Sequence, residues 1–173
     1  GDMVTVDLGV INGWDNAVDN NGEKTLLAGL GVKPLENLGF YLAGTYGGEQ
    51  NGLGKTCTQT DGAIVPCGGL GGAGAKRGVV TLNGTFTPIE GLSIIFDSVY
   101  GNEQDAVLDS ATLQPASASW YGLVGYITYA PNLEPIPGLS LNLRAEVFND
   151  PDGARLAGSY APALPFGTAE TVE

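Results

Sequence analysis

The sequence contains no histidine among its 173 residues. Without histidine, Ser-His-Asp and Cys-His catalytic arrangements cannot form, and the common histidine metal sites are excluded. Basic residues are also scarce, with 7 Lys and Arg against 19 Asp and Glu and a net charge of -12. Nucleic-acid binding needs clustered Lys and Arg that neutralise phosphates. We therefore expect no nucleic-acid partner, no metal and no cofactor.

Only two cysteines occur, Cys57 and Cys67, and both lie in the Gly-rich segment GKTCTQTDGAIVPCGGLGG. Two cysteines without a histidine cannot supply a tetrahedral zinc site. We expect a local disulfide between them in an oxidising compartment, and two free thiols are the alternative.

Long apolar runs are missing as well. No stretch approaches the roughly 20 apolar residues of a membrane-spanning helix, and Gly or Pro interrupts every candidate helical period. Charged residues make up 15% of the chain, below the usual value of about 25%. Such a chain has fewer charges than a water-exposed surface normally carries.

What the sequence does contain is alternation with a period of two, which is typical of strands. Within 78–88, Val80 and Leu82 alternate with Thr81 and Asn83. Successive side chains of a strand point to opposite faces, so each face of the sheet should have one character. The expected strands are 3–13, 25–34, 39–47, 78–88, 93–101, 119–130 and 140–149.

The connections between these runs alternate in length. KPLENLG, TPIEGLS and APNLEPIPGLS are short and contain Pro, whereas 14–24, 48–77 and 102–118 are long and polar. This order predicts an up-and-down meander with short turns at one end. Strands of about ten residues match the ~9–11 that cross a bilayer better than the ~5–6 typical of soluble proteins.

Aromatic residues gather near the ends of the runs, where a membrane barrel carries two interfacial girdles. Those near the long segments are Trp14, Tyr46, Tyr100, Trp120 and Tyr121, and those near the short turns are Phe40, Phe86, Tyr126 and Tyr129. We therefore expect an all-β fold, an antiparallel up-and-down transmembrane β-barrel of which about seven strands are visible. A soluble extracellular β-sandwich that acts as a binding domain is the alternative.

An internal repeat supports a β-hairpin architecture. KPLENLGFYLAGTYGGEQ and TPIEGLSIIFDSVYGNEQ match at a constant offset of 54, which pairs Tyr46 with Tyr100 and Glu49 with Glu103. Repeated hairpins suit a barrel or a propeller, but no propeller blade signature recurs in register. Two carboxylates could suggest a glycosidase pair. Because they sit at strand exits with no evident cleft, we expect no enzymatic activity.

Three stretches carry a family resemblance: INGWDNAVDNNGEKTLLAGLGVKP, LGFYLAGTYGGE and LRAEVFNDPDGAR. They resemble the OmpL-like beta-barrel porins of bacterial outer membranes, over most of the chain. The resemblance implies a passive pore in a Gram-negative outer membrane. The asymmetry of the connections predicts that the long loops are extracellular and the short turns periplasmic. Family members are longer, and both ends of this chain look like cuts. We therefore expect 1–173 to be a single β-barrel domain that is a fragment of a longer barrel.

The polar positions of the strands are predicted to line a water-filled lumen through which small hydrophilic solutes or ions diffuse, while the outer face contacts lipid. The predicted pore-lining residues are Asp7, Lys33, Thr81, Asn83, Thr85, Asp97, Asn142, Arg144 and Glu146. A carboxylate such as Asp97, in the apolar run SIIFDSVY, costs little only if its face is wet. Acids concentrated in the long segments predict a weak cation preference. A non-conducting barrel that anchors or sheaths a partner protein in its lumen remains the alternative, and homo-oligomerisation is left open.

Overall fold

The computed structural model describes residues 3–13, 21–49, 56–58, 64–66, 74–109, 111–112, 114–131, 136 and 138–156. Within these ranges the protein is all-β, as the alternation predicted. The strands are β1 (Val4–Ile11), β2 (Thr25–Leu35), β3 (Leu38–Gly48), β4 (Thr56–Thr58), β5 (Ile64–Pro66), β6 (Lys76–Phe86), β7 (Leu92–Leu108), β8 (Pro115–Tyr129) and β9 (Leu141–Asn149).

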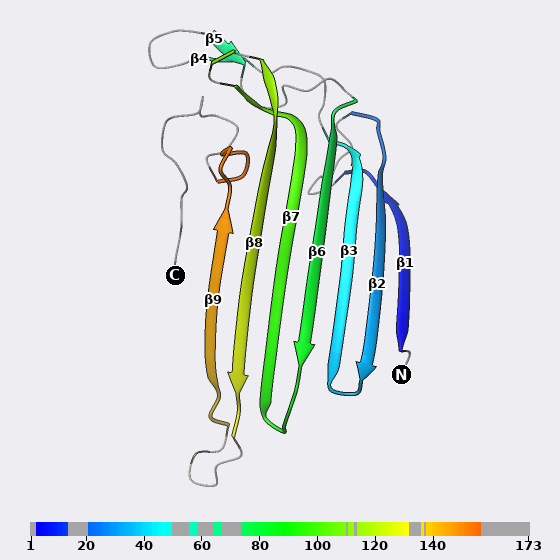
Figure 1. The fold of residues 1–173 in the computed structure, drawn as a ribbon, viewed down its shortest axis with the longest axis vertical. Helices are drawn as coiled ribbons and strands as arrows, with labels where there is room; N and C mark the ends of the chain where they lie inside the picture. Colours follow the sequence, from blue (N-terminus) through cyan, green and yellow to red (C-terminus); the bar gives the residue numbers. More distant parts are fainter. Residues whose placement is uncertain are drawn as a thin grey trace.

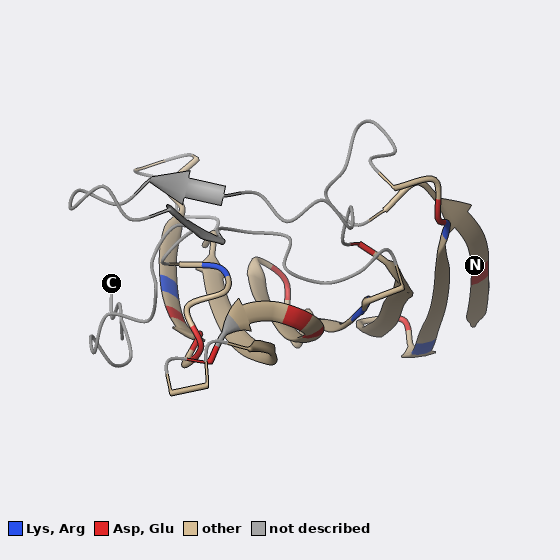
Figure 2. Cartoon of the chain, turned by 90° about the horizontal axis from the view of Figure 1, so that it is seen from above, with Lys and Arg blue, Asp and Glu red and all other residues tan. Residues whose placement is uncertain are grey.

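Seven of these strands form one sheet in the order β1-β2-β3-β6-β7-β8-β9, and every neighbouring pair is antiparallel. The expected meander is confirmed. The connections β2–β3, β6–β7 and β8–β9 lie at one end, drawn at the bottom of Figure 1, and the other connections lie at the opposite end. The hairpin β4–β5 lies in the connection between β3 and β6. Figure 2 shows the sheet from above as a curved wall that does not close on itself.

The strands β7 and β8 are longer than the sequence predicted. Segment 102–118 was expected to be a loop, but β7, which has 17 residues, continues into it as far as Leu108, and β8, which has 15 residues, already begins at Pro115. Their pairing shifts register between Glu103 and Val107, and Asp105 adopts a φ of 51° there. A residue with positive φ at such a shift is typical of a β-bulge, which lets a strand bend and continue. The hairpin therefore extends past the ends of the neighbouring strands.

The two faces of the sheet differ in chemistry along its whole width. One register row passes through all seven strands as Val6, Leu30, Leu42, Leu82, Ser98, Leu123 and Val147. The next row, on the opposite side, passes through Thr5, Gly31, Tyr41, Asn83, Asp97, Val124 and Glu146. We call the face that carries the first row the apolar face and the face that carries the second row the polar face.

The packing is inverted relative to a soluble domain. Among the described residues, the buried hydrophobic side chains are only Ala75, Val79, Ala118 and Trp120. On the apolar face, large side chains are open to the surroundings, as shown by exposed fractions of 82% for Leu8, 64% for Leu143 and 51% for Leu123. Soluble monomers rarely expose an apolar patch larger than a few hundred Å². No helix in the described part of the chain has the length and apolar character needed to span a membrane.

Candidate functional site

All nine residues predicted to line a pore lie on the polar face. Asn83, Asp97 and Glu146 share one register row. Thr85 and Arg144 belong to the next row of this face toward the short connections, and Thr81 belongs to the next row away from them. The alternation of β1, β2 and β9 places the rest of the set, Asp7, Lys33 and Asn142, on the same side. The structure thus brings the set onto one surface, and their role in a lumen stays a prediction.

The apolar face has the composition of a lipid-facing surface. Between the row of Tyr129 and the row of Tyr46, the described strands carry no Asp, Glu, Lys or Arg on this face. Ser98 and, in the row of Tyr121, Asn149 are the exceptions to its apolar and aromatic character. The Ser98 hydroxyl donates to the Leu82 carbonyl at 3.2 Å. A polar group that is satisfied by the backbone can lie in lipid at low cost. The first charge is Lys76, one row beyond Tyr46, where it forms an ion pair with Glu23 at 2.5 Å.

Aromatic side chains mark the two limits of this apolar band. Tyr46, Tyr100 and Tyr121 are all more than half exposed near the long connections, and Tyr129 is at the opposite end. Tyr121 and Tyr129 are eight residues apart in β8, or about 26 Å at ~3.3 Å per residue. Strands of outer-membrane barrels tilt by about 35–45°, so this length covers about 20 Å of an apolar band that is about 25 Å tall.

Two residues assigned to the girdles from the sequence are on the wrong face. Trp120 is 2% exposed and lies on the polar face, where a Cβ added at Gly101 would meet its indole ring at 2.1 Å. Tyr126 is also on the polar face, and its hydroxyl accepts a hydrogen bond from Arg144 Nε at 3.1 Å. Proximity to a strand end correctly predicted the position of these rings along the strands. Only the parity of the residue number in the strand decides the face.

A buried charge cluster lies on the polar face at the long-connection end, formed by Glu49, Arg77, Glu103 and Arg155. The two glutamates are 5% and 3% exposed. The Arg77 guanidinium contacts Glu49 Oε2 at 3.5 Å and Glu103 Oε1 at 2.7 Å. Arg155 reaches the other Glu103 oxygen at 2.8 Å and lies 4.1 Å from the Trp120 ring centre. Burying a charged carboxylate costs much free energy unless it is paired and hydrogen-bonded in this way.

The internal repeat generates this cluster. Each copy ends in Tyr-Gly-x-Glu-Gln, at 46–50 and at 100–104. The strands β3 and β7 that carry the two copies both flank β6, so Arg77 lies between the two glutamates. The repeated glycines leave room for neighbouring side chains, because a Cβ at Gly47 would lie 2.1 Å from the Thr25 hydroxyl oxygen. That hydroxyl donates to Glu49 Oε1 at 2.7 Å.

Sequence reasoning missed Arg77, Arg155 and the burial of both glutamates. The repeat was the signal that could have found them. Both carboxylates are held by arginines, and the expectation that they do not act as a catalytic pair stays a prediction.

The segment after β9 folds back toward β7 through a turn centred on Asp150. This carboxylate is 7% exposed and accepts hydrogen bonds from the backbone N–H groups of Ala154, Arg155 and Leu156, at 3.0, 2.6 and 2.8 Å. Asp152 accepts a further bond from the Ser119 N–H at 2.9 Å. The stretch NDPDGAR, residues 149–155, therefore forms a turn. Its hydrogen bonds place the Arg155 side chain next to Glu103.

Several of the acids that the sequence placed at the long-connection end are bound to other groups of the protein. Glu49 and Glu103 are neutralised by arginines, and Asp150 is used by its own turn. Deeper on the polar face, Asp7 accepts a hydrogen bond from Tyr41 and Glu146 pairs with Arg144. Two charged side chains at other strand positions of this face, Lys33 and Asp97, have no partner in the described part of the chain. Together with Asp7, whose partner is the neutral Tyr41 hydroxyl, they are fixed charges that a solute on this face would meet.

Other sequence-based predictions fall partly outside the described residues. Cys57 lies in β4, and Cys67 lies outside the described residues, so their disulfide stays a prediction. Trp14 is outside them as well. In the part of the chain that the structure describes, no group of three or more carboxylate or cysteine side chains is placed to hold a metal ion.

Long antiparallel strands, one charge-free face between aromatic rows, and short connections at one end define a β-barrel wall of the membrane-spanning class. The family model described as "Putative beta-barrel porin-2, OmpL-like" matches residues 1–172. The chain belongs to this family, which confirms the resemblance of its motifs. Searches of curated proteins and of solved structures found no match. Family membership supports an outer-membrane porin in general and implies a non-enzymatic channel role in the bacterial outer membrane.

Proposed function

We propose that the chain forms part of the wall of a water-filled pore through which small hydrophilic solutes or ions diffuse passively. In this proposal the apolar face contacts lipid and the polar face lines the lumen. The observation that carries it is the contrast between adjacent register rows. Asp97 and Glu146 lie in one row, and the row beside it holds only Leu, Val and Ser98 across all seven strands.

The orientation follows from the lengths of the connections. Outer-membrane barrels have short periplasmic turns and longer extracellular loops. The ends of β2, β6 and β8 would then lie at the periplasmic side, and the buried charge cluster would lie near the extracellular mouth. A disulfide between Cys57 and Cys67 would be on that same oxidising side.

The number of strands supports a larger barrel. In an antiparallel meander of seven strands, the first and the last run in the same direction, so β1 and β9 could pair directly only as a parallel ladder. Open edges in lipid leave N–H and C=O groups without partners. An odd number of further strands closes the barrel with antiparallel pairs alone and gives the even total usual in bacterial outer-membrane barrels. If several copies of this seven-stranded sheet were inserted in the same orientation, β9 of one copy would still meet β1 of the next as a parallel pair.

Conductance of the full-length protein tests the proposal. Purified from outer membranes in detergent and added to a planar bilayer, it should give stepwise increases in current. Replacing Asp97 with Asn should preserve folding and shift the reversal potential in a salt gradient toward anions, because one fixed negative charge leaves the wall. The matched Lys33→Gln variant should shift it toward cations.

Three other results would reject the proposal. Inserted, folded protein without conductance would favour the non-conducting sheath. If Asp97 were sealed in a packed interior, Asp97→Asn would change stability while conductance stays at zero. A folded, monodisperse protein without detergent would favour the soluble β-sandwich.

A further inference from the structure

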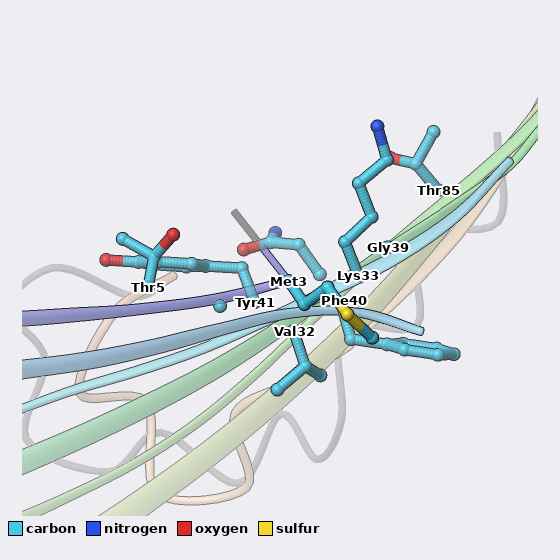
Figure 3. A pocket seen from close by; sticks show the side chains of 10 residues that line it. Met3, Thr5, Val32, Lys33, Gly39, Phe40, Tyr41 and Thr85 are labelled. Carbon is cyan, nitrogen blue, oxygen red and sulfur yellow. The ribbon is translucent and has the colours of Figure 1, made fainter. Parts of the chain in front are cut away.

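The polar face carries a depression near the short-connection end that none of the predicted roles explains. It has a volume of about 280 Å³, and its floor includes Gly31 and Gly39. Thr5, Tyr41, Lys33 and Thr85 stand on one side of the strands in Figure 3, whereas Val32 and Phe40 point to the other side. The volume is near the lower end of ligand sites, which begin at about 300 Å³. It suits a molecule the size of one sugar ring.

Tyr41 forms a fixed, flat platform at one side of this depression. A Cβ added at Gly29 would lie 2.2 Å from the Tyr41 hydroxyl oxygen, and one at Gly31 would lie 3.2 Å from the ring carbon Cδ2. The ring therefore lies along β2, over two residues that have no side chain. Its hydroxyl donates to Asp7 Oδ2 at 2.8 Å, which fixes its direction. An aromatic face held this way can stack against the C–H face of a sugar.

The polar groups around the platform are not used by the protein. In the described part of the chain, the side chains of Lys33, Asn83, Thr5 and Thr85 have no hydrogen-bond or ion-pair partner. Two hydroxyls and an amide both donate and accept, as recognition of a polyol requires, and the ammonium adds three donors and a positive charge. Elsewhere on this face, charges such as Arg77 and Arg144 are paired.

We infer that this depression is a binding site for a single sugar ring, with a preference for a sugar acid whose carboxylate pairs with Lys33. Tyr41 supplies the stacking surface, and Asn83 with the two threonines supplies hydrogen bonds to ring hydroxyls. The inference rests on the proposed function, because the polar face must be open to water for a solute to reach the site.

Binding to the full-length protein in detergent tests this site independently of conductance. Glucuronate and glucose serve as the probes in saturation-transfer NMR. The spectra should show that both sugars contact the protein and that glucuronate binds more tightly than glucose. Tyr41→Ala should weaken both probes by about tenfold, since the platform is lost. Tyr41→Phe should retain more binding than Tyr41→Ala. Lys33→Gln should reduce glucuronate to the affinity of glucose. Tyr126→Ala, which removes an aromatic ring from the same face outside the depression, should leave both affinities within about twofold.

The outcomes separate this site from the pore itself. If the protein conducts ions but contacts neither probe, the sugar site would be wrong and the proposed pore would be unaffected. Equal affinities for glucose and glucuronate in the unmodified protein would overturn the role of Lys33. If Tyr41→Ala and Tyr126→Ala lowered the affinity for the probes equally, the proposed stacking role of Tyr41 would be wrong. Probe contact that depends on Tyr41 in a protein without conductance would support the site and reject free diffusion.

Discussion

Strand β9 allows the same arginine to be tested on both faces of the sheet. Its native Arg144 lies on the polar face, between Leu143 and Ala145 on the apolar face. Moving the arginine by one residue in either direction reverses its face, because the side-chain period of a strand is two. If the apolar face contacts lipid, the cost of this move should depend on depth in the membrane.

The register gives the depth of each position. Leu141 pairs with Tyr129 at one limit of the apolar band, and Ala145 pairs with Gly125, four residues from both Tyr129 and Tyr121. Arginine in place of Ala145 should therefore lower the free energy of unfolding by about 2–4 kcal/mol, and in place of Leu141 by about 0–1 kcal/mol. Leu143→Arg and Val147→Arg, two residues from the centre, should fall between these values.

The assay is equilibrium urea unfolding of the full-length protein in lipid vesicles, followed by tryptophan fluorescence. Asn142→Arg is the matched control on the polar face and should change the free energy of unfolding by less than about 0.5 kcal/mol. A second control exchanges Leu143 and Arg144 and should lose stability although composition is unchanged. Equal costs for Ala145→Arg and Asn142→Arg would refute a lipid-facing apolar face.

Three further predictions concern the long-connection end. Glu103→Gln should lower the free energy of unfolding by about 2–4 kcal/mol, because Arg77 and Arg155 both lose the charge of this carboxylate. In urea unfolding, a midpoint equal to that of a surface control such as Glu36→Gln would contradict this prediction. The Thr112 N–H group, the Thr112 hydroxyl and the Ala111 N–H group hold the pKa of Asp109 below its ordinary value, so ionised Asp109 stabilises this turn at pH values above the unfolded pKa. As the pH falls through the lower, folded pKa, the Thr112 and Ala111 amides should lose their protection from hydrogen exchange. Loss of this protection at a pH above the ordinary value of about 4 would contradict the prediction. Cys57 and Cys67 should resist thiol labelling until a reductant is added, and labelling of two thiols without reductant would contradict a disulfide.

The sequence predicted the parts of the fold that depend on local alternation. The level and face of residues such as Val80 and Asn83 followed from the period of two, because tight turns fix the register. The extension of β7 and β8 beyond Gly101 did not follow. Outside the apolar band, the polar and small residues of that hairpin have no apolar face to alternate with, and the register shift at Asp105 disrupts any simple pattern.

The buried charge cluster was not predictable from local pattern, because its energetics are non-local. A glutamate at a strand exit is normally solvated, and burying it without partners would cost several kcal/mol. Arg77 and Arg155, which offset this cost, come from β6 and from the turn after β9. The repeat at an offset of 54 residues shows that Glu49 and Glu103 occupy equivalent positions in two hairpins. The repeat does not show that β6 lies between β3 and β7, which depends on the order of the strands in the sheet.

Pairing also decides which charges a solute can meet. Arg77 with its two glutamates, and Arg144 with Glu146, present compensated charge to the polar face. Lys33 on β2 and Asp97 on β7 have no such partner in the described part of the chain, and two strands separate them. At roughly 4.8 Å per strand, their backbones are about 14 Å apart, so the two side chains act on a solute separately. Net composition predicts a strongly acidic wall, but ion pairs compensate Arg77, Arg144 and their glutamates, and the strand charges left uncompensated include Lys33, Asp97 and Asp7, which is bonded to the neutral Tyr41 hydroxyl. Asp97→Asn removes one negative charge and Lys33→Gln removes one positive charge, which is why the two single substitutions should move ion preference in opposite directions.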